Sequence, residues 1–134
     1  MKSKRLQYKY RDNASKLHKA VGNRLHNVKG LWSQYKIYQE YPVNKINKKW
    51  SSGRHKFDWV ILDLKLVIEC HGEQHFKPVA FDGDEFAAKQ RFILTVETDR
   101  LKKQAAEEIG FSYVTITDKN IKQFDEILTE VLGR

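Results

Sequence analysis

Carboxylates and imidazoles lie close together in the sequence between residues 58 and 75. Asp58 lies in one apolar segment, Glu69 and His71 end the next one, and His75 follows shortly after. Carboxylates bind hard divalent cations such as Mg²⁺, and an imidazole can accept or donate a proton near neutral pH. A cation of this kind can make a water more acidic and orient a phosphodiester. These residue types therefore indicate metal-assisted hydrolysis.

Residues 55–71, HKFDWVILDLKLVIECH, are predicted to form an antiparallel β-hairpin. Both arms consist mostly of β-branched, aromatic and aliphatic residues, which favour strands. Asp63 and Leu64 lie at the middle, where a two-residue turn would fit, although this pair lacks the glycine usually favoured there. Such a turn would set the register of the hairpin and place Asp58 directly opposite Glu69.

This register would bring two negative charges together on one face of the hairpin. Directly opposed residues have Cβ atoms about 5 Å apart, and like charges at that distance destabilise the sheet unless something compensates them. A divalent cation is the natural compensation. Because side chains alternate, one face is expected to carry Lys56, Asp58, Glu69 and His71. The other face is expected to carry Phe57, Trp59, Ile61, Leu66, Ile68 and Cys70.

Two other interpretations of these residues are open. HGEQH at 71–75 contains zinc-ligand types, but Gly72 would cost a helix about 1 kcal/mol relative to Ala, and Cys70 and His71 would point to opposite faces of a strand. Alternatively, both carboxylates form ordinary ion pairs on a wet sheet face, with Arg54, Lys56 or Lys65.

The elements around the hairpin predict a mixed α/β (α+β) fold. A helix capped by Asp12 or Asn13 and ending near Gly30 should bury Leu17, Val21, Leu25 and Val28. The remaining order predicted from the residue patterns is three strands, a helix, a strand and a helix. The first strand is expected at 34–43, and the two arms of the hairpin form the next two strands. The second helix is expected at 85–109, with a possible break at 92–96. The last strand is expected at 111–116 and the last helix at 121–132.

The positive charge of the chain is concentrated in its first half. Residues 1–56 hold 15 Lys and Arg residues but only two acids, Asp12 and Glu40. Such a surface should attract a polyanion, most commonly a phosphate backbone. A basic arm at 1–12 is expected to precede a single domain. The residues expected to contact nucleic acid are Lys16, Lys19, Arg24, Lys48, Lys49, Arg54, Lys56 and Lys102.

Composition also narrows the cellular setting. No apolar run approaches the roughly 20 residues that span a bilayer, and MKSKRLQYKY lacks the apolar core of a signal peptide. Cys70 is the only cysteine, so no intrachain disulfide can form. We therefore expect no membrane partner and a cytoplasmic location, in a bacterial or phage-infected cell.

The motif residues resemble the PD-(D/E)XK nuclease superfamily. The resemblance rests on Asp58, ECHGEQHF at 69–76 and TDRLKK at 98–103, covers roughly residues 13–117, and is closest to the very-short-patch-repair-like branch with its small phage and homing enzymes. It implies a restriction-endonuclease-like mixed sheet of about four strands flanked by helices, and a Mg²⁺-dependent DNA-cleaving centre in which Mn²⁺ can substitute.

The resemblance also implies roles for individual residues. Asp58 and Glu69 would hold the metal, with the carbonyl of Cys70 as a third ligand. His75 or His71 would move a proton. Gln74 would orient water or phosphate, and Asp99 matches an acidic residue on the later helix.

The chain departs from the family pattern in three places. Phe57 replaces the proline of the family name, and His71 occupies the position where many relatives have lysine, so His71, Lys56 or Lys102 would supply the positive group. Relatives carry a glutamate on the first helix, but no acid lies between Asn13 and Gly30, and Glu40 could substitute. Asp99 and Lys102 could equally form a routine ion pair on one helix.

The expected activity is therefore that of a metal-dependent DNA endonuclease of phage or mobile-element type. Its partner would be double-stranded or branched DNA, bound by a monomer or a homodimer. Two alternatives are a non-catalytic nucleic-acid-binding module on a nuclease scaffold and a Holliday-junction or branched-DNA resolvase.

Overall fold

The structure is a computed structural model that describes residues 9–72, 75–80 and 83–133. The first part of the predicted basic arm and Gln74 lie outside these residues. In the part of the chain that is described, no helix has the length and apolarity needed to cross a membrane.

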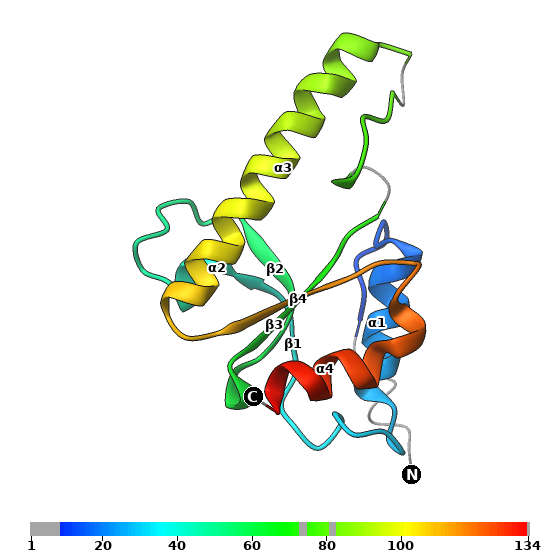
Figure 1. Cartoon of the computed structure of the whole chain (residues 1–134), viewed down its shortest axis with the longest axis vertical. Helices are drawn as coiled ribbons and strands as arrows, with labels where there is room; N and C mark the ends of the chain where they lie inside the picture. The colour runs from blue at the N-terminus through cyan, green and yellow to red at the C-terminus, as the bar shows by residue number, and fades with distance from the viewer. Residues whose placement is uncertain (1–8, 73–74, 81–82, 134) are drawn as a thin grey trace.

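A four-stranded mixed sheet forms the centre of the molecule (Figure 1). Its strand order is β1-β2-β3-β4, in which β2 is antiparallel to both β1 and β3, and β4 is parallel to β3. The predicted fold class, a mixed sheet of about four strands flanked by helices, is confirmed. The elements are α1 (Lys16–His26), β1 (Tyr38–Pro42), α2 (Val43–Ile46), β2 (Lys56–Ile61), β3 (Leu66–Cys70), α3 (Glu85–Glu108), β4 (Ser112–Ile116) and α4 (Phe124–Leu132), with 3₁₀ turns at Leu62–Leu64 and Ile121–Gln123.

Helices cover both faces of the sheet and create two cores. On one face α1 and α4 pack over β2, β3 and β4, and this core includes Leu17, Val21, Leu25, Trp59, Ile61, Leu66, Ile68, Val114, Ile116, Phe124 and Leu128. On the other face α2 and the end of α3 pack over the sheet, in a core that includes Val43, Ile46, Phe57, Val60, Val67, Ala105 and Ala106.

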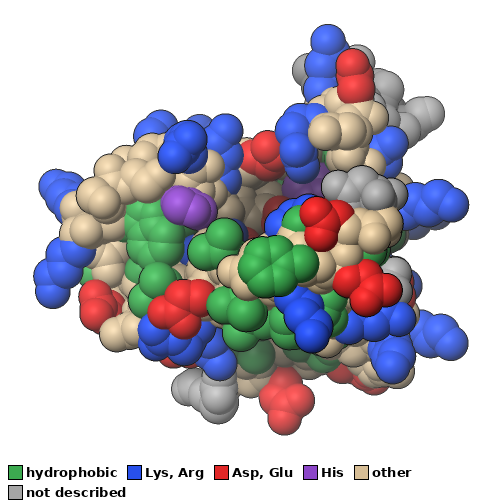
Figure 2. Space-filling view, turned by 90° about the horizontal axis from the view of Figure 1, so that it is seen from above, with side chains coloured by type: hydrophobic (Ala, Val, Ile, Leu, Met, Phe, Trp, Pro, Cys, Tyr) green, Lys and Arg blue, Asp and Glu red, His purple; other side chains and the backbone are tan. Residues whose placement is uncertain are grey.

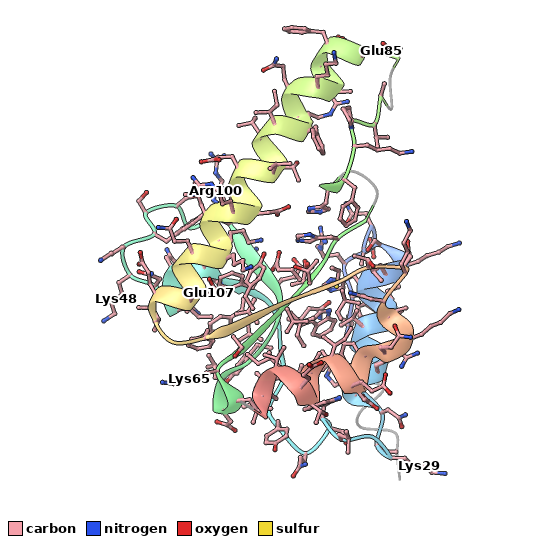
Figure 3. The ribbon with its side chains drawn as sticks, viewed as in Figure 1. Lys29, Lys48, Lys65, Glu85, Arg100 and Glu107 are labelled. Carbon is pink, nitrogen blue, oxygen red and sulfur yellow. The ribbon has the colours of Figure 1, made fainter. Side chains whose placement is uncertain are left out.

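Helix α3 is much longer than the sheet that it covers. Figure 3 shows Glu107 near the sheet and Glu85 at the far tip of the helix. The helix runs without the break that the sequence allowed at 92–96. Asp84 caps its start by accepting from the Ala87 backbone N–H, and Gly110, at φ 90°, ends it. Its distal half leaves Phe86 and Leu94 exposed.

The first helix is shorter than predicted. Ser15, rather than Asp12 or Asn13, caps α1 by accepting a hydrogen bond from the His18 backbone N–H. Because α1 ends at His26, Val28 lies beyond it and is 48% exposed, so its predicted burial is wrong.

The predicted hairpin register is confirmed, but the predicted turn is wrong. Trp59 pairs with Ile68 and Ile61 pairs with Leu66. The connection is a 3₁₀ turn at Leu62–Leu64 followed by Lys65 in the left-handed region, at φ 49°. The observed connection is longer than the predicted two-residue turn by one residue from each strand. The pairing of the remaining residues is therefore unchanged.

Gly22 provides a test of the contact between α1 and the sheet. A Cβ atom there would lie 2.6 Å from Trp59 Cζ2 and 2.5 Å from Tyr10 Oη, too close for any real side chain. Alanine is the better helix former by about 1 kcal/mol, yet we expect Gly22→Ala to lower the free energy of unfolding by about 1–3 kcal/mol, because Trp59 is fully buried. Denaturant unfolding measures the change.

Gly53→Ala is the matched control. The nearest atom to a Cβ at Gly53 is Asn44 Nδ2 at 3.8 Å, so this substitution should leave stability nearly unchanged. A Gly22→Ala protein as stable as the wild type would mean that α1 does not pack against Trp59 in this way.

Candidate active site

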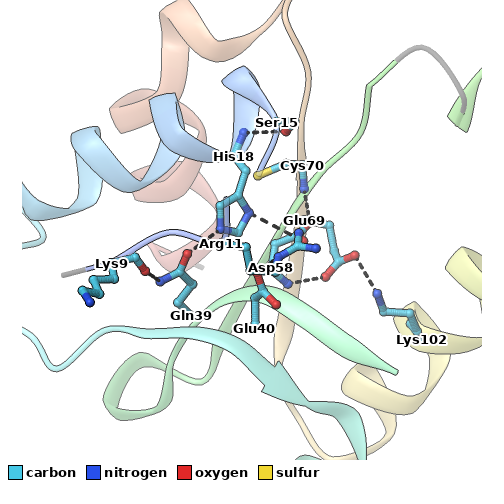
Figure 4. A network of polar contacts seen from close by, with 10 residues as sticks. All are labelled: Lys9, Arg11, Ser15, His18, Gln39, Glu40, Asp58, Glu69, Cys70 and Lys102. Atoms are coloured by element: carbon cyan, nitrogen blue, oxygen red, sulfur yellow. Dashed lines mark hydrogen bonds and ion pairs between the residues drawn. The ribbon is translucent and has the colours of Figure 1, made fainter. Parts of the chain in front are cut away.

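The carboxylates of Asp58 and Glu69 join β2 and β3 where the backbone ladder ends. Ladder pairing extends from Ile61 and Leu66 to Trp59 and Ile68. Beyond that point the Asp58 backbone N–H donates to Glu69 Oε2 at 2.9 Å, and the Cys70 backbone N–H donates to Asp58 Oδ2 at 2.7 Å (Figure 4). We call these two residues the acid pair. Their side chains take the place of backbone acceptors, so both are held at fixed positions.

The two carboxylates meet between β2 and β3, but their other contacts lie on opposite sides of the sheet. Asp58 Oδ1 lies 3.8 Å from His18 Nδ1 on the α1 side, whereas Glu69 accepts a hydrogen bond from Lys102 of α3. The prediction that they share one face is therefore wrong. The reason lies in β2, where Trp59 also stacks on the His18 ring, at 4.8 Å between centroids. Two consecutive residues face α1, so the alternation of side chains is broken there.

The neighbouring strand β1 is irregular at the same level. Glu40 lies between the paired residues Gln39 and Tyr41, has a φ of 52°, and does not pair with Asp58 in the ladder. Its carboxylate forms an ion pair with Arg11. Glu40, the predicted substitute for a first-helix glutamate, is therefore already engaged by the segment that precedes α1.

Glu69 is a buried acid with a basic partner from α3. It is only 2% exposed, and Lys102 Nζ donates to its Oε1 at 2.9 Å. Burial and the nearby Asp58 carboxylate raise the pKa of Glu69 to about 8, although the Lys102 ammonium opposes this shift. The Lys102 ammonium also lies 5.5 Å from the centre of the Phe57 ring. Phe57 thus belongs to the α3 face and not, as predicted, to the face of Trp59.

This contact identifies which candidate cation lies beside the acid pair. Of the three predicted sources of positive charge, Lys102 is the one that bonds to Glu69. Lys102 is only 9% exposed and its ammonium lies beside the acid pair, so its predicted contact with a DNA phosphate stays a prediction. The predicted alternative ion pair between Lys102 and Asp99 is wrong, because Asp99 bonds to His75.

His71 and His75 form a stacked pair beside Asp99, which we call the histidine pair. Their rings are 4.1 Å apart and nearly parallel, at 6°. His75 Nδ1 lies 2.7 Å from Asp99 Oδ2 and His71 Nε2 lies 3.8 Å from the same oxygen. Burial and the neighbouring His75 lower the pKa of His71 to about 4, so His71 is neutral at pH 7. A proton on His75 Nδ1 would leave Nε2 free to act as a base.

The histidine pair is poorly arranged to hold one metal ion together. The lone pair of an imidazole nitrogen lies in the plane of its ring. Two parallel stacked rings cannot both contain the same ion in their planes, although these nitrogens and an Asp99 oxygen lie within 4.8 Å of one another. Proton transfer suits this geometry better than metal binding.

A pocket of about 520 Å³ lies beside His71. It is lined by His71, Gly72, Phe76, Lys77, Thr117, Asp118 and Lys119. The Phe76 side chain is 58% exposed, and a Cβ atom at Gly72 would have no neighbour within 4 Å. A ligand could therefore approach His71 from this side.

The other predicted site residues lie as follows. Cys70 packs against the core of the α1 face, as predicted, and burial together with Asp58 raises the pKa of its thiol. The predicted nucleic-acid contacts other than Lys102 are exposed. They are Lys16, Lys19, Arg24, Lys48, Lys49, Arg54 and Lys56.

His18 is a site residue that the sequence did not reveal. It lies on the apolar face of α1 next to Leu17 and reaches Asp58 across the layer between helix and sheet. Only its place on the buried face of a basic helix, where a polar side chain needs a partner, could have indicated it.

Removing the Glu69 carboxyl should change how stability depends on pH. Its pKa is raised from 4.5 to about 8, so the folded protein holds a proton there that the unfolded chain has lost. The free energy of unfolding of metal-free protein should therefore fall as pH rises between about 6.5 and 8, by at most about 1.4 kcal/mol per pH unit. Below pH 6.5 the lowered pKa of His71 acts in the opposite direction.

Glu69→Gln should flatten this pH dependence, whereas Glu130→Gln, at an exposed carboxylate, should keep it. Denaturant unfolding at several pH values in the presence of a chelator measures both. Equal slopes for wild type and Glu69→Gln would show that Glu69 is ionised throughout this range.

Comparison with protein-family models and with curated proteins found no match to this chain. What the protein does must therefore be inferred from the chemistry of its own residues.

Proposed function

We propose that this chain is a metal-dependent DNA endonuclease of the PD-(D/E)XK type. One observation carries the proposal: Asp58 and Glu69 are fixed on adjacent strands by bonds to each other's strand, with Lys102 against Glu69. Two acids and a lysine at the end of a hairpin are the groups that phosphodiester cleavage with a divalent cation needs. In this chain the lysine comes from α3 instead of from β3.

The acid pair fits a divalent cation. Asp58 Oδ1 makes no hydrogen bond with any described residue, while Oδ2 is occupied by the Cys70 backbone N–H. The pKa of Glu69 is raised by burial and then by the nearby Asp58 carboxylate, so the ionised acid pair needs more positive charge than Lys102 supplies. Mg²⁺ or Mn²⁺ would supply that charge, and Asp58 with Glu69 would hold it. When bound, the cation would acidify a water and stabilise the leaving oxygen.

The residues around the acid pair have separate roles in this mechanism. Asp99 holds His75 with Nδ1 protonated and turned toward its carboxylate, so that His75 Nε2 can accept a proton from the attacking water. His71 stays neutral at pH 7 and stacks on His75, which limits the movement of that ring. Lys102 keeps Glu69 in place and provides a positive charge at the phosphate.

DNA would bind across the basic surface. Lys and Arg side chains lie on both sides of a hollow beside α3 in which acidic and histidine side chains are visible (Figure 2). Exposed cations on α1 and in the segment before β2, such as Lys16, Lys19, Lys48 and Arg54, would contact phosphates and give affinity without sequence specificity. The acid pair would repel a DNA phosphate, so the phosphate would bind there only when the divalent cation is also bound.

A non-catalytic DNA-binding module is the second candidate. It is favoured by Glu69, because both of its oxygens already accept hydrogen bonds, from the Asp58 backbone N–H and from Lys102. Such a module would bind DNA through the same exposed cations but would cut no substrate. A cleavage assay separates the two candidates.

Replacing Asp58 should abolish cleavage. With Mg²⁺ or Mn²⁺, the wild type should cut at least one member of a panel of linear, mismatched, nicked and four-way DNA substrates. Asp58→Asn should be slower by a factor of about 10³ or more, because a lost metal ligand removes several kcal/mol of transition-state stabilisation. Gel analysis of end-labelled DNA measures the rates.

Asp63→Asn is the control from the same hairpin, since Asp63 is exposed in the turn, and it should cut at the wild-type rate. Wild-type protein that leaves every substrate intact with both metals would contradict the nuclease proposal. So would equal cleavage by Asp58→Asn, which would indicate a contaminant.

His75 and Asp99 should act as one unit in cleavage. His75→Ala should lower the single-turnover rate by about 10²–10⁴, as expected for loss of a general base. Asp99→Asn should lower it less, because this residue acts through His75, and the double variant should be no slower than His75→Ala alone. Multiplicative effects in the double variant would mean that the two side chains act independently.

A further inference from the structure

His18 is a buried histidine at the junction of α1 and the sheet. Its side chain is 3% exposed and stacks on the fully buried ring of Trp59, at 4.8 Å and 26°. A buried imidazole normally has partners for both ring nitrogens, because an unsatisfied polar group costs free energy. His18 Nε2 has a hydrogen-bond partner, Gln39 Oε1, whereas Nδ1 lies 3.8 Å from the Asp58 carboxylate.

A chain of hydrogen bonds determines which nitrogen of His18 carries the proton (Figure 4). Gln39 Nε2 donates to the Lys9 carbonyl at 2.8 Å, which fixes the orientation of the Gln39 amide. Gln39 Oε1 therefore faces His18 Nε2, at 2.9 Å. Since an amide oxygen can only accept, His18 Nε2 must donate. In the neutral ring, Nδ1 then carries a lone pair and no proton.

The lone pair of His18 Nδ1 faces other acceptors. Asp58 Oδ1 lies 3.8 Å away, too far for a hydrogen bond, and Nδ1 makes no hydrogen bond with any described residue. The Cys70 sulfur, one nitrogen of the His18 ring and one oxygen of Asp58 lie within 4.8 Å of one another. An imidazole nitrogen, a carboxylate oxygen and a sulfur are the atom types that bind transition-metal ions.

We propose that His18 Nδ1, Asp58 Oδ1 and Cys70 Sγ form a binding site for a divalent first-row transition-metal ion. Metal–nitrogen and metal–oxygen bonds are about 2.0–2.2 Å, so one ion can bridge atoms 3.8 Å apart. The inference deepens the proposed function and rests on it for the role of the ion in cleavage. Metal binding itself requires no such activity.

The donor set predicts which ions bind best. Mg²⁺ prefers oxygen ligands, whereas imidazole and sulfur favour Mn²⁺, Co²⁺ and Zn²⁺ in increasing order. The site should thus bind all three more tightly than Mg²⁺. Binding through sulfur would release the thiol proton of Cys70 to solvent. In this chain the first helix would provide a nitrogen ligand at the position where related nucleases are expected to provide a carboxylate.

Cobalt titration of the full chain without DNA tests the proposal. Co²⁺ should produce visible d–d absorption and a sulfur-to-metal charge-transfer band in the near ultraviolet. Cys70→Ser should remove the charge-transfer band and keep the visible absorption. His18→Gln should weaken Co²⁺ and Mn²⁺ binding by at least about 10-fold. Loss of a group that only hydrogen-bonds to a metal ligand already weakens metal binding by about that factor, and loss of a ligand itself should weaken it more.

His26→Gln is the matched control. His26 comes from the same helix and also lies against Trp59, at 5.7 Å between ring centroids, but it is not part of this cluster. Its variant should bind Co²⁺ like the wild type. Binding by His18→Gln with wild-type affinity and spectrum would overturn the proposal.

A second measurement on wild-type protein covers the case in which His18→Gln does not fold. Nitrogen-15 NMR of the histidine rings should show that Zn²⁺ shifts the His18 Nδ1 resonance and leaves Nε2 protonated. An unshifted Nδ1 resonance would also overturn the proposal. Metal binding at His18 without DNA cleavage would contradict only the nuclease function, and cleavage without such binding would contradict only this metal site.

Discussion

The reciprocal bonding of Asp58 and Glu69 is the constraint on which the rest of the site depends. Each carboxylate accepts a backbone N–H from the opposite strand, so neither can leave without exposing an unsatisfied donor between β2 and β3. Hydrogen bonds to charged acceptors are stronger than neutral ones. Two carboxyl groups are thereby kept close together inside the protein, an arrangement that is unfavourable when both are ionised and no positive charge lies nearby.

The broken alternation of β2 divides this charge between the two layers of helices. Asp58 faces α1 and meets His18, whereas Glu69 faces α3 and meets Lys102. Each acid therefore has one basic or nitrogen partner from a different helix. A regular hairpin would have placed both acids against the same helix and left the other helix without a role in the site. The irregular strand is what makes α1 and α3 parts of one centre.

The sequence predicted the order of the strands and of the longer helices, and the register of the hairpin, because both depend on local patterns. It did not predict the short helix α2 between β1 and β2. The alternation of apolar residues between Trp59 and Ile68 allows one pairing only. It could not predict that Asp58 and Trp59 face the same way, since this break is set by contacts with residues far away in the chain. His18 was missed, and Lys102 was named only as one of three candidates for the positive group, for the same reason: their partners are decided by how the helices pack.

Glu69 and His71 differ in the charge that their surroundings disfavour, and a bound cation would compensate the charge of Glu69. The pKa of Glu69 is raised because burial and the Asp58 carboxylate disfavour a negative charge there, while the pKa of His71 is lowered because burial, His75 and Lys102 disfavour a positive charge. The two effects occur two residues apart, near the end of β3 and just beyond it. Positive charge is therefore lacking on the acid pair but not at the histidine pair, and this difference separates a metal-binding side of the site from a proton-transferring side.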